Sequence, residues 1–375
     1  HGIQCDDHSN PTIEDNIITS NRFNGIYCFN YSNPTIKSNI ITSNGAHAWG
    51  SGISCDDHCS PTIQNNTVTN HPNCGITAHS YSNPLIKEND ITSNTQWGIQ
   101  CDTYSSPIIQ GNRIALNNFS GIICSGYSNP IVQGNEITLN RHWGITCQNG
   151  SRPEIHWNDI TNDEVGNEDP TVVINATYNY WGSPEGPGGN VSANVAYNPW
   201  LNEPIIVVGI TYPLQGWIIS GVVTVAVDAR AVKGISAVRF YLDGALVHTD
   251  YDSPYQWSWN TTHYAEALHE IRAVAHGILG IKRMAAVTVG VDNTLPAGKI
   301  TSPEMGAYVS GTCSISLFAF DVNFKAMTLY VDEDLMETWL SGGNQTYNWN
   351  TKAYSDGEHA IKLMIRDKAG NNRTV

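Results

Sequence analysis

The chain has 375 residues, of which only 14% are charged, and its formal net charge is −15. This length predicts two or three domains, and an acidic chain without clustered Lys or Arg argues against binding to nucleic acid or to anionic membrane surfaces. No stretch approaches the roughly 18 apolar residues of a membrane-spanning helix. Because the chain begins at His1 without Met, we expect an upstream segment to be missing or removed.

Seven similar segments fill residues 1–160, each opening with Gly followed by Ile. Their spacing is 23 residues, apart from one spacing of 27. Pro follows each Gly after nine residues, Asn after fourteen, and a β-branched residue two positions later. The three apolar pieces of each segment are too short for helices and are separated by turn residues. One segment therefore predicts one coil of a parallel β-helix, with coils stacked ~4.8 Å apart.

Each position of the repeat should form a column of like residues along the axis. The Ile columns are expected to fill the core, and the Asn column can form a ladder of side-chain amide hydrogen bonds. The Asn column comprises Asn16, Asn39, Asn66, Asn89, Asn112, Asn135 and Asn158.

Six of the nine cysteines share one repeat position, with Ala78 in the seventh place. They are Cys5, Cys28, Cys55, Cys101, Cys124 and Cys147. Since the Ile two residues earlier faces the same way, we interpret these cysteines as small core residues; a metal or redox ladder is the alternative. Cys59 and Cys74 lie off this column, where a disulfide between them stays open, and Cys313 stands alone.

Acidic residues follow the cysteine position in alternate segments. They are Asp6, Asp7 and His8 in the first, Asp56, Asp57 and His58 in the third, and Asp102 in the fifth. Such groups can bind Ca²⁺, and paired carboxylates can hydrolyse glycosides. Matching carboxylates two coils apart are separated by roughly 9–10 Å, too far to share one ion. Solvated turn residues are the alternative interpretation.

Aromatic residues form a further column and are candidate ligand-binding residues together with Asp102. Tyr31, Tyr81, Tyr104 and Tyr127 lie six residues after their glycines, Trp97 and Trp143 precede theirs, and Trp49 belongs to the four-residue insertion of the second segment. Aromatic faces on such a wall can stack on sugars, or they can pack on one another.

The pattern changes after the repeats. Residues 175–201 are rich in aromatic residues, Gly and Pro, and we expect Trp181 and Trp200 to cover the end of the core. From residue 203 longer alternating strands appear, and Trp-Asn-Thr recurs at 259–261 and 349–351. Two copies of an all-β unit predict immunoglobulin-like sandwiches.

The segments resemble the parallel β-helix repeats of secreted archaeal and bacterial proteins, a group that includes periplasmic NosD-like proteins and polysaccharide-acting enzymes. Residues 203–375 resemble extracellular Ig-like repeats. These resemblances imply an all-β fold: a right-handed parallel β-helix over 1–202 and Ig-like sandwiches over 203–294 and 295–375, the last apparently lacking its final strand. Of the polygalacturonase motifs N-T-D, D-D, G-H-G and R-I-K, only D-D occurs here, so no catalytic residue is assigned.

The leading hypothesis is a secreted structural or adhesive surface protein, such as a filament, sheath or surface-layer subunit, whose partners are other copies of itself or surface glycans. Nine Asn-X-Ser/Thr sequons suit a glycosylated surface. The alternative is a carbohydrate-binding protein or polysaccharide-degrading enzyme, a lyase or glycoside hydrolase, that acts through the β-helix wall. A third hypothesis, NosD-like metal delivery, rests on the resemblance alone.

Overall fold

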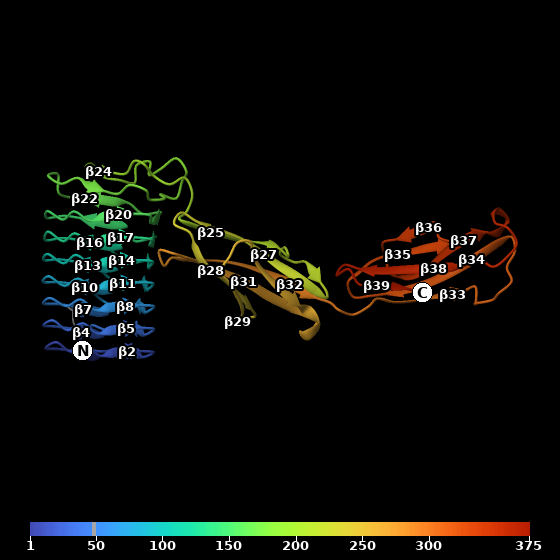
Figure 1. The fold of residues 1–375 in the computed structure, drawn as a ribbon, viewed down its shortest axis with the longest axis horizontal. Helices are drawn as coiled ribbons and strands as arrows, with labels where there is room; N and C mark the ends of the chain where they lie inside the picture. The colour runs from blue at the N-terminus through green and yellow to red at the C-terminus, as the bar shows by residue number, and fades with distance from the viewer. Residues whose placement is uncertain (47–49) are drawn as a thin grey trace. The chain divides into compact units, whose positions relative to one another are not determined.

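The computed structural model describes residues 1–46 and 50–375, and it confirms the predicted all-β fold class. A parallel β-solenoid is followed by antiparallel sheets (Figure 1). The described residues include no helix long and apolar enough to cross a membrane. Trp49, a predicted ligand-binding residue, lies outside the described residues.

Three parallel sheets form the walls of the solenoid. The first contains β1 (Ile3–Cys5), β4 (Ile26–Cys28), β7 (Ile53–Cys55), β10 (Ile76–Ala78), β13 (Ile99–Cys101), β16 (Ile122–Cys124), β19 (Ile145–Cys147) and β22 (Val165–Asn167). The second contains β2 (Thr12–Glu14), β5 (Thr35–Lys37), β8 (Thr62–Gln64), β11 (Leu85–Lys87), β14 (Ile108–Gln110), β17 (Ile131–Gln133), β20 (Glu154–His156), β23 (Ile174–Asn175) and β24 (Val195–Ala196). The third contains β3 (Ile17–Thr19), β6 (Ile40–Thr42), β9 (Thr67–Thr69), β12 (Asp90–Thr92), β15 (Arg113–Ala115), β18 (Glu136–Thr138) and β21 (Asp159–Thr161).

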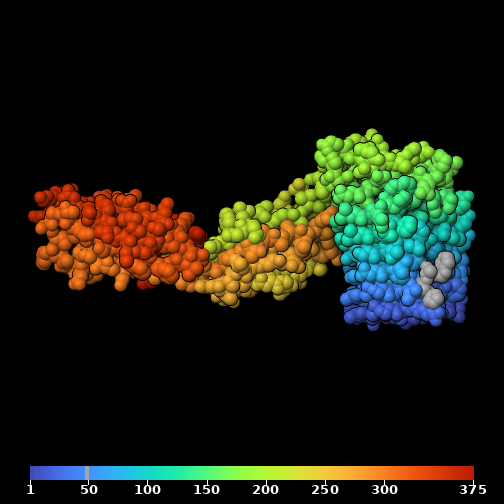
Figure 2. Space-filling view, turned by 180° about the vertical axis from the view of Figure 1, so that it is seen from behind, coloured from blue at the N-terminus to red at the C-terminus, as the bar shows by residue number. Residues whose placement is uncertain are grey.

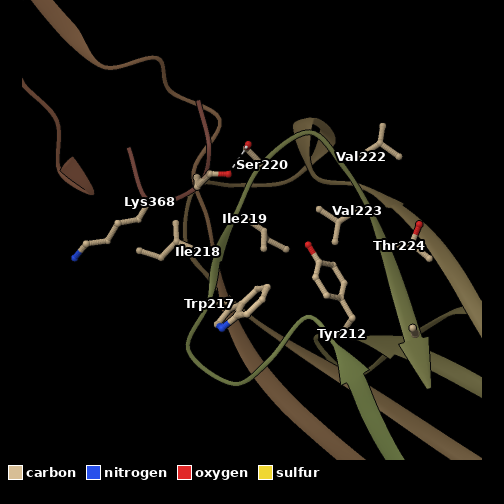
Figure 3. Close-up of a pocket in the computed structure, with 11 residues that line it drawn as sticks. Tyr212, Trp217, Ile218, Ile219, Ser220, Val222, Val223, Thr224 and Lys368 are labelled. Atoms are coloured by element: carbon tan, nitrogen blue, oxygen red, sulfur yellow. Dashed lines mark hydrogen bonds between the residues drawn. The ribbon is translucent and has the colours of Figure 1, made fainter. Parts of the chain in front are cut away.

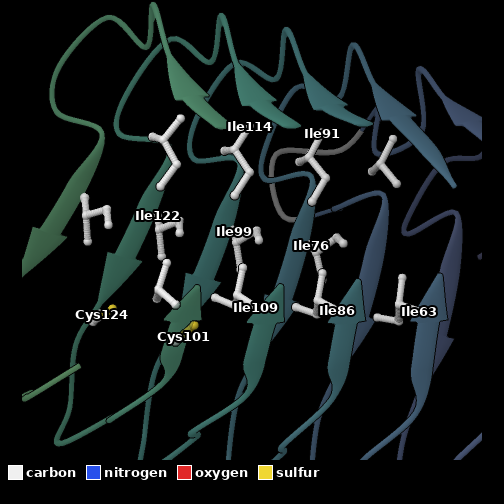
Figure 4. Packing of buried hydrophobic residues seen from close by; sticks show 14 of the residues in the cluster. Ile63, Ile76, Ile86, Ile91, Ile99, Cys101, Ile109, Ile114, Ile122 and Cys124 are labelled. Atoms are coloured by element: carbon white, nitrogen blue, oxygen red, sulfur yellow. The ribbon is translucent and has the colours of Figure 1, made fainter. Parts of the chain in front are cut away.

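Equal repeat positions pair across successive coils, so the columns expected from the sequence are present. Ile99 pairs with Ile76 on one side and with Ile122 on the other. The inward Ile side chains stack in rows, and from Ile26 to Ile160 they are fully buried (Figure 4). The blue-to-green coils pack directly on one another in the space-filling view (Figure 2). Each coil therefore buries its apolar face against its two neighbours.

Asn side chains hold the coils in register. Asn66 Nδ2 donates to Asn89 Oδ1 at 3.0 Å and to the Ile36 carbonyl at 2.9 Å, while Asn66 Oδ1 accepts from Asn39. The ladder runs from Asn16 to Asn158 and ends on Asn179. Because every buried amide is satisfied by the next coil, this polar column is compatible with the core.

In the second coil, whose segment has four extra residues, Gly45 and Gly50 form a close backbone contact, here called the glycine neck. Gly45 has a φ of +92°, and a Cβ placed on it would lie 2.1 Å from the Gly50 carbonyl oxygen. The two backbone segments thus touch, and a side chain at Gly45 would separate them. The register is unaffected beyond the neck, where Ile53 pairs with Ile26.

Residues 275–283 pack against the solenoid, within one compact unit that comprises residues 1–207, 229–237 and 275–283. The left-handed corner residue between the second and third solenoid sheets is Gly at 111 and 134, and there Leu279 and Gly280 contact the backbone so closely that a Cβ would lie under 3 Å away. Arg283 donates to Glu136 and to buried Asp159, both at 2.8 Å. Glycine at these two corners therefore opens the space that the segment occupies.

The two Trp residues expected at the end of the solenoid core do contribute there. Trp181 is buried in the core cluster, and Trp200 packs against it from a half-buried position. The Trp200 indole nitrogen donates to the Pro184 carbonyl at 3.1 Å.

Two sheets follow between residues 206 and 291. One contains β25 (Ile206–Tyr212), β27 (Val222–Ala231) and β30 (Tyr255–Asn260); the other contains β26 (Ile218–Ile219), β32 (Lys282–Val291), β31 (Leu268–Gly277), β28 (Ile235–Leu242) and β29 (Ala245–Asp250). A 3₁₀ turn, η1 (Thr261–His263), follows β30.

The last pair of sheets repeats this plan. One contains β33 (Ala297–Ser302), β34 (Thr312–Phe320) and β37 (Gly343–Asn350); the other contains β36 (Asp334–Trp339), β35 (Phe324–Val331), β38 (Ile361–Asp367) and β39 (Asn372–Thr374), with η2 (Thr351–Ala353) after β37. The predicted domain boundaries at 202/203 and 294/295 stay predictions.

Candidate functional site

A turn with two left-handed residues follows each strand of the first solenoid sheet from β1 to β19, and it positions the aromatic column. Tyr81 and Tyr104 occupy its second left-handed place, with φ of +65° and +62°. The residue before them, Ser80 or Thr103, takes the first place. This backbone turns the aromatic side chain outward at the same point of each coil.

The aromatic column is a continuous stack that includes two histidines. Its members are His8, Tyr31, His58, Tyr81, Tyr104 and Tyr127, with ring centroids 4.8–5.5 Å apart and interplanar angles of 6–11°. Each internal ring thus has neighbours on both faces, although the four tyrosines remain 45–57% exposed. What the column presents to solvent is ring edges and hydroxyl groups, whereas sugar stacking needs open ring faces.

The acidic residues of these turns are held by local hydrogen bonds. Asp6, Asp56 and Asp102 each accept the backbone N–H of the following residue through Oδ1, at 2.7–2.9 Å. Asp7 accepts from Asn30, and Asp57 lies 2.8 Å from Nδ1 of His58. The carboxylates therefore stabilise their own turns, as Asp commonly does at left-handed turns.

The structure does not gather the predicted metal ligands Asp6, Asp7 and His8, or Asp56, Asp57 and His58, into a cluster of three ligand atoms. Among the described residues, the group with that geometry is Asp292, Asp321 and Asp367, whose ligand atoms lie within 4.8 Å of one another.

Burial and the neighbouring carboxylates Asp292 and Asp367 raise the pKa of Asp321. Asn371 donates to Asp367, and Asn323 donates to Asp292. Carboxylate oxygens at this spacing suit a hard cation such as Ca²⁺.

The six cysteines of the repeat column point into the core and are 0–2% exposed. All nine cysteines fall within the described residues and are free, so Cys59 and Cys74 are not joined. The pKa of the Cys124 thiol is raised by hydrogen bonding with the Cys101 thiol and by burial. Burial raises the pKa of Cys74 to about 12. The Cys124 and Cys74 thiols are therefore kept protonated, and both are out of contact with solvent.

The predicted Trp97 and Trp143 immediately precede the glycines before β13 and β19. Trp97 contacts Phe119 with ring centroids 5.9 Å apart. Trp143 covers Gly166, where a Cβ would lie 1.9 Å from its ring. These Trp rings cover backbone and neighbouring rings of the wall.

A hollow of about 550 Å³ lies beside the loop between β25 and β27, outside the solenoid. Tyr212 and Trp217 meet edge to face, with ring centroids 5.4 Å apart at 88°, and both rings are about two-fifths exposed. Figure 3 shows these two rings directed into the space between the loop and β27, with Val223 and Thr224 beyond them. The volume of the hollow lies within the range of small-molecule sites.

Two features of this wall were not predicted from the sequence, although a signal existed: the place of His8 and His58 in the aromatic column, and a second polar ladder. His8 and His58 share the six-residue offset of the tyrosines. A second polar ladder occupies offset 19 and comprises Asn21, Asn44, His71, Asn94, Asn117, Asn140 and Asp163. Asp292, Asp321 and Asp367 carry no common spacing, so nothing local predicts that they meet.

Taken together, the coils and the paired sheets define a right-handed β-helix region joined to bacterial Ig-type units. The family described as right handed beta helix region matches residues 1–85 and 51–179, and the bacterial Ig domain family matches residues 207–273 and 296–363. This composition is that of a cell-surface or carbohydrate-associated protein and is consistent with an extracellular one. A search of the curated proteins found no significant match.

Among solved structures, the fibronectin(III)-like modules of Clostridium thermocellum CbhA are 20% identical, with 45% of this chain and 90% of that chain covered and a TM-score of 0.36. A Bacteroides ovatus mixed-linkage glucan utilization protein, SGBP-B, bound to a heptasaccharide, is 15% identical, with 45% of each chain covered and a TM-score of 0.20. A bacterial ice-binding adhesin is 14% identical, with 46% of this chain and 63% of that chain covered and a TM-score of 0.24.

Proposed function

We propose that this protein is an extracellular structural or adhesive component of a cell surface, in which the solenoid is a stiff element and the Ig-type units are spacers. The observation that carries the proposal is that the polar and aromatic columns of the solenoid contact one another and their own backbone. Asp102 is bonded to its own turn, Tyr104 is stacked on both faces, and Cys101 is buried in the core. The residue types that could supply chemistry instead stabilise the stack of coils.

The partners proposed for this role are other copies of the chain. Imaging of native cell surfaces with labelled antibody, together with sedimentation of the purified chain over a wide concentration range, tests this. Ordered arrays on the surface and reversible assembly in solution are expected. Dispersed monomers at high concentration, with diffuse labelling, would contradict it.

A second candidate function is carbohydrate binding, and the hollow at Tyr212 and Trp217 favours it. Exposed aromatic rings flanked by hydroxyl groups can hold the apolar face of a sugar while its hydroxyls form hydrogen bonds. A glycan array should then show binding that Trp217→Ala removes and Tyr104→Ala, on the solenoid wall, leaves intact. Loss with Tyr104→Ala alone would move the site to the wall, and a reducing-sugar assay on any bound polysaccharide tests degradation.

A further inference from the structure

The aromatic column contains an uninterrupted run of three tyrosines. Tyr104 is stacked between Tyr81 and Tyr127, with ring centroids 5.3 and 5.5 Å apart and interplanar angles of 6° and 11°. Tyr31 is separated from this run by the His58 ring, which contacts both Tyr31 and Tyr81. Among the ring contacts of the described residues, these two pairs are the Tyr–Tyr contacts.

The three phenols combine mutual contact with access to solvent. Their exposed fractions are 49%, 50% and 57% for Tyr81, Tyr104 and Tyr127. Since Tyr81 and Tyr104 have stacked rings on both faces, the edges that carry the hydroxyl and its ortho carbons are their exposed part, whereas Tyr127 ends the stack with a ring on one face. Equal positions on adjacent coils are ~4.8 Å apart, so two neighbouring rings that swing out of the stack about their side-chain bonds can bring their ortho carbons together.

We propose that Tyr81, Tyr104 and Tyr127 are a site of oxidative coupling that joins adjacent coils covalently. A one-electron oxidant of the peroxidase class, with hydrogen peroxide as the terminal acceptor, removes one electron and one proton from each of two phenols. The two phenoxyl radicals couple through their ortho carbons. Each ring then loses its ortho hydrogen to the solvent as a proton while the phenol O–H is restored. Two tyrosines and one peroxide give one dityrosine and two waters.

This coupling would supply a covalent cross-link between coils, which the cysteines of the solenoid cannot form. The column thiols are buried and out of reach of an oxidant, and all nine cysteines of the described chain are free. A carbon–carbon bond between coils limits the chain entropy of the unfolded state, as a disulfide does. A coupled solenoid should therefore unfold at a higher temperature than the untreated one.

The test treats the dilute full-length chain with hydrogen peroxide and a haem peroxidase. The monomer fraction is then isolated for dityrosine fluorescence and peptide mapping. We expect linked peptides that contain Tyr81 with Tyr104, or Tyr104 with Tyr127, and an upward shift of the unfolding temperature.

Tyr104→Phe should abolish both products, because the remaining tyrosines are two coils apart. Tyr104→His, which copies the rings at His8 and His58, should do the same and guards against a folding defect. Tyr308→Phe, at a fully exposed tyrosine, should leave the products unchanged. A monomer without dityrosine, or equal coupling in the Tyr104 variants, would overturn the proposal.

Discussion

At the scale of single residues, the second polar ladder contains two exceptions to its run of asparagines, and both titrate. Asn140 donates its side-chain amide to Oδ2 of Asp163 at 2.8 Å, and Asp163 is 4% exposed. Burial raises the pKa of Asp163 to about 7. The folded state therefore retains a proton that the unfolded chain releases between about pH 4 and pH 7, so stability falls as the pH rises through that range.

Asp163→Asn should remove this pH dependence. An amide at 163 can accept from Asn140 as the other ladder members do, without burying a charge. Above pH 7 we expect the variant to be more stable than the parent by a few kcal/mol, since one pKa unit corresponds to about 1.4 kcal/mol. Urea unfolding at pH 5 and pH 8 measures the difference. Asp252→Asn, at an exposed carboxylate, serves as the control, and equal slopes for parent and variant would contradict the assignment.

His71 should produce the opposite slope. Its Nδ1 lies 3.1 Å from the backbone nitrogen of Asn44, and its Nε2 lies 3.1 Å from the Ile41 carbonyl oxygen. The neutral ring therefore accepts at Nδ1 and donates at Nε2. Burial lowers the pKa of His71. The unfolded chain then binds a proton as the pH drops below about 6.5 while the folded ring resists it, and stability is lost toward acid.

Replacing His71 by Asn should flatten the acid side of the stability profile. The same urea titrations between pH 5 and pH 8 measure this, with His263→Asn at an exposed position as the control. If His71→Asn destabilises the chain equally at every pH, the ring acts through its shape rather than its charge.

At the scale of elements, one coil depends on both of its neighbours. Ile99 is fully buried between the equivalent Ile residues of two coils. Ile99→Asp places an unpaired charge there and should unfold the central coils, whereas Ile99→Val should cost only about 1 kcal/mol. Limited proteolysis between residues 76 and 147 reports the outcome. A digestion pattern identical to the parent would mean that this side chain does not face the core.

The segment 275–283 should depend on Arg283 more than on any surface ion pair. Its two partners, Glu136 and Asp159, are largely withdrawn from solvent, and the Asp159 side chain is 1% exposed. Removing the guanidinium leaves buried Asp159 without a counter-ion, although the Ile205 backbone N–H still donates to it, and loss of such a partner typically costs about 3–5 kcal/mol. Arg283→Ala should therefore speed hydrogen exchange across 275–283.

The exposed pair Arg230–Glu203 provides the control for this variant. Arg230→Ala should cost at most about 1 kcal/mol, because exposed pairs are screened by water and salt. If the two substitutions had equal effects, the ion pairs of Arg283 would not be what holds segment 275–283 in place.

The elements that could be predicted from the sequence are those that repeat. The Ile, Cys and Asn columns were predictable because the period places equal residues in contact, and register follows from spacing alone. His8 and His58 occupy the same repeat offset as Tyr31, but because they are not tyrosines they were not assigned to the aromatic column. The role of Gly111 and Gly134 could not be predicted from the repeat, because glycine is needed there for a contact with Leu279 and Gly280, more than 140 residues away in sequence. The Asp292, Asp321 and Asp367 cluster depends on non-local sheet geometry in the same way.

At the scale of the whole molecule, separate cores predict separable unfolding. The solenoid has one continuous core cluster, and the last pair of sheets has its own, built around Leu317, Leu329 and Trp349. Leu329→Asp should abolish the calorimetric transition of the last sheets and leave that of the solenoid unchanged, while Ile99→Asp should do the reverse. A single transition that both substitutions abolish would mean that the chain folds as one cooperative body.

The glycine neck at residues 45 and 50 allows the length of the chain at this corner of the solenoid to change. Because the Gly45 and Gly50 backbones meet there and Ile53 still pairs with Ile26, the four extra residues of this segment shift no column. Length changes at this corner are thus uncoupled from the core, whereas a single added residue within a strand would turn its inward side chains outward. Evolution, or a designer wishing to display a foreign peptide, can lengthen this corner while the rest of the sequence stays fixed.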